Sequence, residues 1–217
     1  MQDGPKIKIL FEDNKLLVVE KPPGLLSQSD FTGRPDVLTQ AKAYIKEKYN
    51  KPGNVFVGLM HRLDKEVGGV MVLARNSKAA KYVSEQIRNG QFKKTYLAEV
   101  ENPDLPDQGS LVNYLVKDEK RNLVTVVDES TTGAKLAKLK YEVVSRTSKT
   151  AIVRIQLETG RSHQIRVQFA NIGHPLVGDA KYGARIKPIE VNIRLWSSSI
   201  EIIHPGTRKK MMFISRG

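Results

Sequence analysis

The stretch HRLDKEVGGVMVLAR, from His61 to Arg75, sets an acid beside a base and a cation, then bends and turns apolar. Asp64 follows His61 and Arg62 closely, and two glycines come after it. The apolar run from Val70 to Ala74 has the length and composition of a buried strand. We therefore expect a reactive loop that passes through a close backbone turn into a sheet.

Strand signals dominate the chain on both sides of this stretch. A turn at Asp13-Asn14 divides the first apolar segment into two predicted strands, and residues 56–63 are predicted to be extended. The alternation in QFKKTYLAEVEN puts four residues on one face of a strand: Phe92, Tyr96, Ala98 and Val100. Two hairpins and two further strands are predicted in LVNYLVKDEKRNLVTVV, KLKYEVVSRTSKTAIVRIQLE, LWSSSIEII and MMFIS.

Three segments have the apolar spacing of amphipathic helices. Their predicted N-caps are Asp36, Ser77 and Ser162. The second helix is expected to bury three residues: Ala80, Val83 and Ile87. Strands joined by hairpins, with a few helices, predict an α+β fold with a mixed, largely antiparallel central sheet and flanking helices. We expect residues 1–217 to form a single domain, because neither side of the irregular segment 102–109 is self-sufficient.

The composition favours a polyanionic partner. Lysine and arginine number 36 against 23 aspartates and glutamates, which gives a net charge of +13. Such an excess attracts nucleic acid, although a merely soluble basic surface would have the same composition. A membrane surface is less favoured because no basic amphipathic helix is present.

Other features of the composition narrow the class of protein further. The chain has no cysteine, and its four histidines are scattered, so neither disulfides nor a metal site is expected. No apolar run is long enough to cross a membrane, and no apolar signal core follows the N-terminus. We therefore expect the protein to reside in the cytoplasm.

Three short segments place reactive side chains where the backbone conformation is well predicted. They are HRLD before the glycine pair, KTY in an alternating strand, and ETGRSHQIRVQ at the start of a helix. Each has a purely structural alternative. Asp64 could cap a turn, and Tyr96 could be a core tyrosine. Arg161 and Arg166 could bind a phosphate at the helix start.

Taken together, these places resemble the RluA-type family of RNA pseudouridine synthases. HRLDKEVGG is similar to the family's catalytic-aspartate motif, KKTYLAEV to its tyrosine motif and GRSHQIRV to its arginine motif. EKPPGLL and GHPLVGDAKYG also match, in the family's order, so the resemblance covers nearly the whole chain. The chain departs from the pattern at Val67 and Gly68, where the family usually has threonine and serine. The resemblance begins so early that no separate N-terminal RNA-binding domain is expected.

The resemblance implies an isomerase that detaches uracil from its ribose, rotates it and rejoins it through carbon 5. Asp64 matches the essential aspartate, which acts either as a nucleophile or as a base at the ribose. Arg166 matches the arginine that pairs with this aspartate, and a nearby cation favours the ionised carboxylate. Tyr96 matches the tyrosine that stacks on the flipped uracil. No cofactor and no metal are expected, because nothing is oxidised and no group is imported.

Four further residues are candidates for RNA binding under the same resemblance. Arg62 matches the arginine that holds the displaced RNA, and Ile165 is a candidate for the apolar side of the uracil pocket. Arg161 and His163 are expected to contact or orient the RNA. Histidine in general suits a general base near neutral pH, which makes His61 and His163 candidates, but the resemblance assigns catalysis to neither.

The expected partner is structured RNA, with large-subunit ribosomal RNA ahead of transfer RNA, and the protein is expected to act as a monomer. A catalytically silent RNA-binding protein of the same fold is the main alternative, supported only by Val67 and Gly68. A basic hydrolase using Asp64 with His61 or His163 is a third hypothesis. It is weak because the sequence has no serine elbow, paired carboxylate motif or set of metal ligands.

Overall fold

The structure, a computed structural model, describes residues 5–30, 32–188 and 193–216. It divides into two compact units. The first unit combines Met1–Lys93 with Trp196–Gly217, and the second unit is Lys94–Leu195. The expectation that residues 1–217 act as one catalytic domain stays a prediction.

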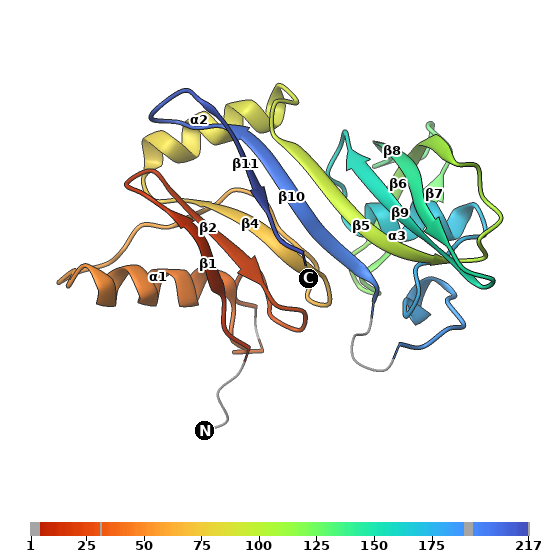
Figure 1. The fold of residues 1–217 in the computed structure, drawn as a ribbon, viewed down its shortest axis with the longest axis horizontal. Helices are drawn as coiled ribbons and strands as arrows, with labels where there is room; N and C mark the ends of the chain where they lie inside the picture. Colours follow the sequence, from red (N-terminus) through yellow and green to blue (C-terminus); the bar gives the residue numbers. More distant parts are fainter. Residues whose placement is uncertain (1–4, 31, 189–192, 217) are drawn as a thin grey trace. The chain divides into compact units, whose positions relative to one another are not determined.

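The first unit is built on a mixed sheet (Figure 1). Its main strands lie in the order β1 (Lys8–Glu12), β2 (Leu16–Lys21), β4 (Gly68–Ala74) and β10 (Leu195–Ile203). Two further strands pair with this set: β11 (Lys210–Ile214) with β10, and β3 (Gly58–Leu59) with β4. The β4–β10 pair is parallel, and the other pairs are antiparallel. Most of the predicted extended stretch 56–63 is irregular, because only two of its residues pair with β4.

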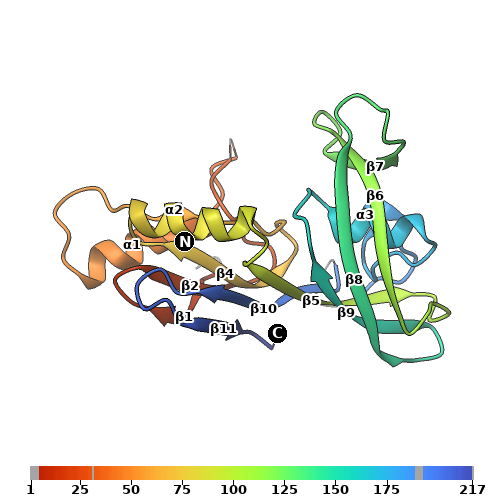
Figure 2. The same cartoon turned by 90° about the horizontal axis from the view of Figure 1, so that it is seen from above.

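Helices α1 (Val37–Lys48) and α2 (Ser77–Arg88) lie on the same side of these strands (Figure 2). Asp36 caps α1 as predicted, because its carboxylate accepts a hydrogen bond from the Thr39 N–H at 2.9 Å. The predicted cap of α2 at Ser77 is wrong. Asn76 caps this helix through a 2.9 Å bond from the Ala79 N–H, and Ser77 is its first helical residue.

The buried face of α2 also differs from the prediction. It consists of Ala79, Val83 and Gln86, whereas Ile87 is exposed. Gln86 is buried without cost because its side-chain amide exchanges two hydrogen bonds with the main chain of Ile203, at 2.8 and 2.7 Å. Apolar periodicity could not reveal this, since the clamp uses a polar side chain.

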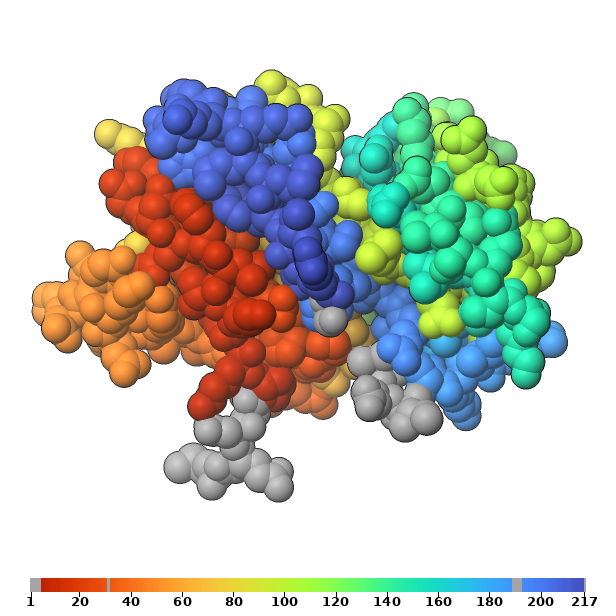
Figure 3. Space-filling model, in the orientation of Figure 1, coloured from red at the N-terminus to blue at the C-terminus, as the bar shows by residue number. Residues whose placement is uncertain are grey.

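Both faces of the central strands are covered. Leu16, Leu17, Val18 and Val19 of β2 are all fully buried, although successive side chains point to opposite faces. One face packs into a cluster with residues of the neighbouring elements: Val70, Val72, Val83, Phe92, Ile200, Ile202 and Phe213. At the edges of the sheet β1 and β11 approach each other, and the rings of Phe11 and Phe213 are 5.3 Å apart. In Figure 3 the red N-terminal strands and the blue C-terminal strands therefore share one surface.

The second unit is an antiparallel sheet with a helix against it. Its strands lie in the order β5 (Lys93–Glu101), β9 (Thr150–Leu157), β8 (Lys135–Arg146), β6 (Gln108–Asp118) and β7 (Leu123–Val127). Helix α3 (Gln164–Asn171) packs on β6 and β7, and a short 3-10 helix, η1 (Ala180–Tyr182), follows. Both predicted hairpins are confirmed.

Two details of the second unit bear on the site. Tyr96, Ala98 and Val100 are buried on one face of β5 as predicted, whereas Phe92 precedes the strand. The predicted cap of α3 at Ser162 is wrong. His163 occupies the cap position in the left-handed region, with φ 48°, and its side chain makes no capping bond.

The predicted α+β class, with a mixed and largely antiparallel sheet and flanking helices, is confirmed. Among the described residues, no helix has the length and apolar character needed to cross a membrane.

Candidate functional site

The loop that carries Asp64 is anchored on both sides of this residue. The Ser27 hydroxyl donates to the Leu63 carbonyl at 2.7 Å and accepts from the Leu63 N–H at 3.0 Å. On the other side, the carbonyl of Lys65 accepts from the Gly24 N–H at 2.9 Å. Asp64 is half-buried, and its own carbonyl accepts from the Val67 N–H at 3.0 Å. The position of the acid is therefore fixed through the main chain.

Lys21 is the centre of this anchoring. Its side chain is fully buried, and its Nζ donates to the carbonyls of Pro22, Leu25 and Lys65 at 3.0, 2.6 and 2.9 Å. Burial lowers the pKa of Lys21 to about 7, while the nearby carboxylates of Glu66 and Asp64 act in the opposite direction. The Lys21 amine, at the end of β2, thus ties the turn that follows it, Pro22 to Leu25, to the loop that carries Asp64.

The two glycines after Asp64 are required because the chain passes very close to Trp196 and Ser197 there. Gly69 has φ 116°, and a Cβ there would overlap the main chain of Ser197 in β10. A Cβ on Gly68 would overlap the indole of Trp196. The replacement of the usual serine at position 68 is therefore explained by packing, because the indole fills the space. Val67, the other departure, is buried in the core.

The two residues before Leu63 have different surroundings. His61 accepts a hydrogen bond at Nε2 from the Val72 N–H at 3.0 Å, and its ring lies 5.3 Å from that of Phe92. This bond ties the loop to β4, which is a structural role. Arg62 is exposed. Its predicted contact with RNA stays a prediction.

In the second unit, Arg166 of α3 is held by a carboxylate that the sequence did not single out. Its Nε and Nη2 donate to the two carboxylate oxygens of Asp179 at 2.7 and 2.8 Å, and both side chains are buried. Such a two-pronged pair fixes the plane of the guanidinium as well as its position. The predicted pairing of Arg166 with Asp64 stays a prediction, because the two residues belong to different units.

Tyr182 of η1 joins this arginine to His163. The Arg166 guanidinium carbon is 5.1 Å from the centre of the Tyr182 ring. The Tyr182 hydroxyl lies 2.7 Å from Nδ1 of His163 and accepts from the Val124 N–H at 3.0 Å. The structure therefore brings two predicted residues, Arg166 and His163, into one network of the second unit.

The remaining predicted residues of this unit lie on β5, on α3 and in the segment just before α3. Tyr96 and Ile165 are buried, whereas Arg161 is exposed and anchored by a 2.9 Å bond from its Nε to the Leu136 carbonyl. Gln164 fixes the loop by accepting from the Arg161 N–H at 3.0 Å. The side chain of Arg161 thus has a fixed base and a solvent-facing end.

Four residues of the site were missed by sequence reasoning: Lys21, Ser27, Asp179 and Tyr182. They lie in or next to EKPPGLL and GHPLVGDAKYG, two segments that matched the family without being assigned a role. Within the described residues no three histidine, aspartate or glutamate side chains are grouped so as to hold a metal ion. The absence of a metal from the reaction stays a prediction.

Comparison with known proteins points to one family. A family model described as RNA pseudouridylate synthase matches residues 15–171. An RNA pseudouridine synthase of Mycoplasma pneumoniae described as uncharacterized is 31% identical over 95% of this chain and 65% of its own length. The ribosomal large subunit pseudouridine synthase D of Xylella fastidiosa is 36% identical over 86% of this chain and 54% of its own length. The chain thus spans two thirds or less of these relatives.

A solved structure supports the same assignment. The human RNA pseudouridylate synthase domain containing 4 has a TM-score of 0.79 and 25% identity, and the match covers 96% of this chain and 87% of the human chain. Both the sequence and the architecture are therefore shared over most of the chain. The protein belongs to the RNA pseudouridylate synthase family, as its resemblance to the RluA-type enzymes indicated.

Proposed function

We propose that this chain is an RNA pseudouridine synthase that isomerises uridine within structured RNA. The observation that carries the proposal is the anchoring of Leu63 and Lys65, the two neighbours of Asp64, by Ser27, Lys21 and Gly24. A reacting group must be held close to its productive position, and anchoring of its neighbours achieves this. Family membership supplies the reaction class.

The reaction requires the target nucleotide to leave the RNA helix. Flipping costs roughly a few kcal/mol, and stacking of the base on Tyr96 would return roughly 1–3 kcal/mol. The bond between C1′ of the ribose and N1 of uracil then breaks, and a bond between C1′ and C5 forms. The C5 proton is replaced by one at N1, so atoms and electrons balance without a cofactor.

Asp64 supplies the group that starts this exchange, either by attacking C1′ or by removing a ribose proton. Arg166, fixed by Asp179, supplies the positive charge that pairs with an ionised carboxylate. Arg62, Arg161, His163 and Ile165 contact the RNA around the target.

The substrate we favour is large-subunit ribosomal RNA, because relatives in Xylella fastidiosa and Buchnera aphidicola carry that activity in their names. Transfer RNA is the second candidate. A catalytically silent RNA-binding protein is less favoured, because the packing of Trp196 against Gly68 is enough to account for the absence of a serine there. Action as a monomer in the cytoplasm stays a prediction.

The test is a pseudouridine map of total RNA from cells that lack the gene, complemented by wild type, Asp64→Asn or Glu66→Gln. Glu66 is the matched control, because it is a carboxylate two residues away that pairs with Lys65 at 3.3 Å. We expect one or more sites to vanish without the gene. Wild type and Glu66→Gln should restore them, and Asp64→Asn should not.

The map also names the substrate, since the affected position lies either in ribosomal or in transfer RNA. If no site changes while the purified protein still binds RNA, the silent-binder alternative replaces the proposal. If Asp64→Asn restores every site, the enzyme assignment survives but Asp64 is not its catalytic residue.

A further inference from the structure

The first unit carries most of the positive charge of the chain. It holds 20 lysines and arginines against 11 aspartates and glutamates, whereas the second unit holds 16 against 12. Part of this excess lies where α2 runs beside the turn between β10 and β11. Lys78 and Lys81 project from α2, and Arg208 and Lys209 lie in the turn. We call these four exposed residues the basic platform.

The platform is rigid because its two parts are bound to each other. The side-chain amide of Gln86 in α2 is clamped to the main chain of Ile203, at the end of β10. The guanidinium carbon of Arg208 is 3.9 Å from the centre of the Tyr82 ring of α2. Stacking uses the face of a guanidinium and leaves its N–H groups, which lie in the plane, able to bind oxygen ligands.

The turn itself is held by a buried histidine. Nδ1 of His204 accepts hydrogen bonds from the N–H groups of Gly206 and Thr207 at 3.3 and 3.0 Å. Nε2 of His204 lies 2.9 Å from the carboxylate of Asp13, which ties the turn to the β1–β2 turn. Arg208 has φ 60°, a left-handed conformation that non-glycine residues adopt at a cost. The structure thus keeps Arg208 in a fixed and unfavourable conformation against α2.

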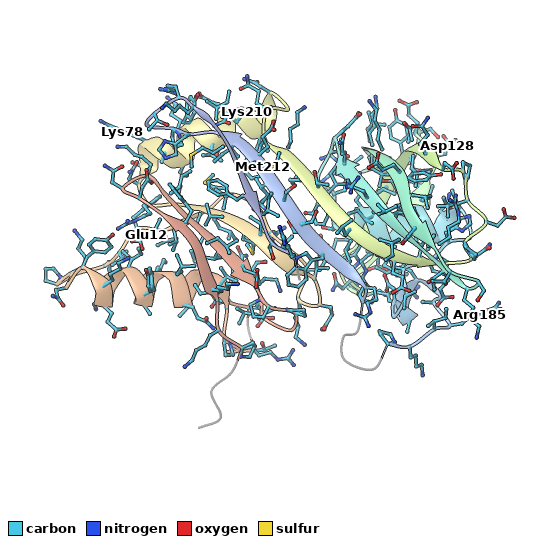
Figure 4. All side chains as sticks on the ribbon, viewed as in Figure 1. Glu12, Lys78, Asp128, Arg185, Lys210 and Met212 are labelled. Carbon is cyan, nitrogen blue, oxygen red and sulfur yellow. The ribbon has the colours of Figure 1, made fainter. Side chains whose placement is uncertain are left out.

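The platform has an unbalanced charge. Within the described residues, Lys78, Lys81, Arg208 and Lys209 make no ion pair. The neighbouring acid Glu201 is already paired, at 2.9 Å, with Lys210. Figure 4 labels Lys78 on α2 and Lys210 at the start of β11, the two elements that border this surface. Unpaired cations on a rigid frame fit a phosphate backbone, whereas mobile cations would lose more freedom on binding.

The platform is far from the Asp64 loop. Trp196, at the beginning of β10, is paired with Gly68, which lies just after that loop. The turn of the platform begins after Ile203, at the other end of β10. At about 3.3 Å per residue, these two ends of the strand are roughly 23 Å apart. A short loop of RNA at Asp64 therefore does not reach the platform.

We propose that Lys78, Lys81, Arg208 and Lys209 form a second RNA-binding surface, which holds the phosphate backbone of a helical segment of the substrate distant from the target uridine. This inference rests on the proposed function for the identity of the partner as RNA. Helical RNA is recognised largely by shape and through its phosphates and 2′-hydroxyls, which suits cations that project from a rigid frame. The surface would make the enzyme select RNAs in which the target lies next to an extended helix.

The test compares two triple variants in the full chain. The platform variant is Lys78→Gln, Lys81→Gln and Lys209→Gln. The matched control, Lys42→Gln, Lys46→Gln and Lys51→Gln, removes the same charge from exposed lysines in and just after α1 of the same unit. The probe is a fluorescein-labelled RNA duplex of about 24 base pairs, and binding is followed by anisotropy from about 50 to 200 mM salt, where phosphate contacts dominate the salt dependence.

We expect the platform variant to weaken binding about 10-fold or more at low salt and to flatten the salt slope by about 2 to 3. The control should weaken binding less than about 2-fold, because diffuse charge is screened. A third variant, Arg208→Lys, keeps the charge but loses the flat stack on Tyr82, and it should lie between the two. The two triple variants should unfold at the same temperature as wild type, since the mutated amines are exposed.

Equal losses in the two triple variants would overturn the proposal, because net charge alone would then explain the affinity. Unchanged binding in the platform variant would overturn it as well, including the case in which this variant instead loses binding to anionic lipid vesicles. The assay is independent of catalysis and is repeated in the Asp64→Asn background. A failed platform therefore leaves the enzyme assignment intact, and an inactive enzyme leaves the platform intact.

Discussion

The two units fix their principal candidate residues in opposite ways. Asp64 is positioned through main-chain bonds to its neighbours Leu63 and Lys65, with Lys21 as the buried donor. Arg166 is positioned through its own side chain, by the two carboxylate oxygens of Asp179. These bonds hold the loop around Asp64 through the main chain and hold Arg166 through its guanidinium.

The difference follows from what each group has to do. A carboxylate that reacts with ribose must present its oxygens to the substrate, so the loop that carries it has to be fixed. An arginine that supplies only charge and orientation keeps its function while two of its N–H groups are engaged, because the guanidinium has five donors. Mutations of the two anchoring sets should therefore affect turnover and stability in different proportions.

Asp179→Asn tests the side-chain mode of anchoring and should have the largest effect. It removes the charge of a carboxylate that binds the buried Arg166 guanidinium through both of its oxygens, which costs about 3 kcal/mol of unfolding free energy. Pseudouridine formation should fall about 100-fold or more in single-turnover assays, because the orientation of Arg166 is lost. Thermal unfolding and the single-turnover rate constant measure the two effects.

The matched control for this change is Asp107→Asn, which breaks an exposed pair with Arg146 at 2.7 Å in the same unit. Such surface pairs contribute about 0–1 kcal/mol, so stability and turnover should remain near wild type. If Asp179→Asn lowers stability but leaves the rate constant unchanged, Asp179 supports only the fold and the contrast between the units disappears.

Lys21→Met tests the main-chain mode. It removes the Nζ donor shared by the carbonyls of Pro22, Leu25 and Lys65, of which Lys65 keeps the Gly24 N–H, and should cost about 2–3 kcal/mol. Turnover should fall about 10-fold, less than for Asp179→Asn, because Ser27 still holds Leu63. The control is Lys42→Met, an exposed lysine of α1, for which neither quantity should change.

The pH dependence of stability gives the same residue a second readout. Burial lowers the pKa of Lys21 to about 7, whereas an unfolded lysine titrates near 10.4. Between these values the unfolded chain binds a proton that the folded chain does not, so stability rises with pH. Wild type should gain about 2 kcal/mol from pH 7.5 to 9 relative to Lys21→Met. If the stability of wild type and of Lys21→Met depends on pH in the same way, the lowered pKa does not belong to Lys21.

Much of the fold could be predicted from the sequence because its strands alternate and its turns carry standard residues. The hairpins, the Asp36 cap and the strand after the glycine pair follow from these local signals. The caps of α2 and α3 could not be placed correctly. Asn76 stood one residue before an equally plausible serine, and His163 adopts a left-handed conformation that no pattern of polar residues announces.

The site divides in the same way. Asp64, Tyr96 and Arg166 could be named because the motifs that carry them resemble a known family. Lys21 and Asp179 could not, since burial of a charge depends on partners that lie 44 and 13 residues away along the chain. Sequence patterns identify the residues that react. They identify less well the residues that hold these reacting residues in place.

A third charged cluster, around Glu12, lets anchoring of the fold be compared with anchoring of the candidate reacting residues. The carboxylate of Glu12 in β1, labelled in Figure 4, accepts hydrogen bonds from Tyr44, Lys48, Tyr49 and Arg75 at 2.6 to 3.0 Å. Burial raises its pKa, but the bonds from Lys48, Tyr49 and Tyr44 outweigh burial and lower the pKa to about 2. This cluster joins α1 to the sheet.

Glu12→Gln should therefore have the smallest effect of the three changes, and only on stability. The contribution of Glu12 is complete above pH 4.5 and is lost as the pH falls toward 2, because the depressed pKa belongs to the folded state alone. After allowance for solvent screening, wild type should lose about 1–2 kcal/mol more than Glu12→Gln between pH 5 and 2.5. Turnover at pH 7 should stay within about 2-fold of wild type, since an anchor affects the chemistry only through the loop that it holds. If turnover of Glu12→Gln falls as much as that of Lys21→Met, the loss of any strong anchor in the first unit slows the reaction. The difference between main-chain and side-chain anchoring would then reflect only general stability.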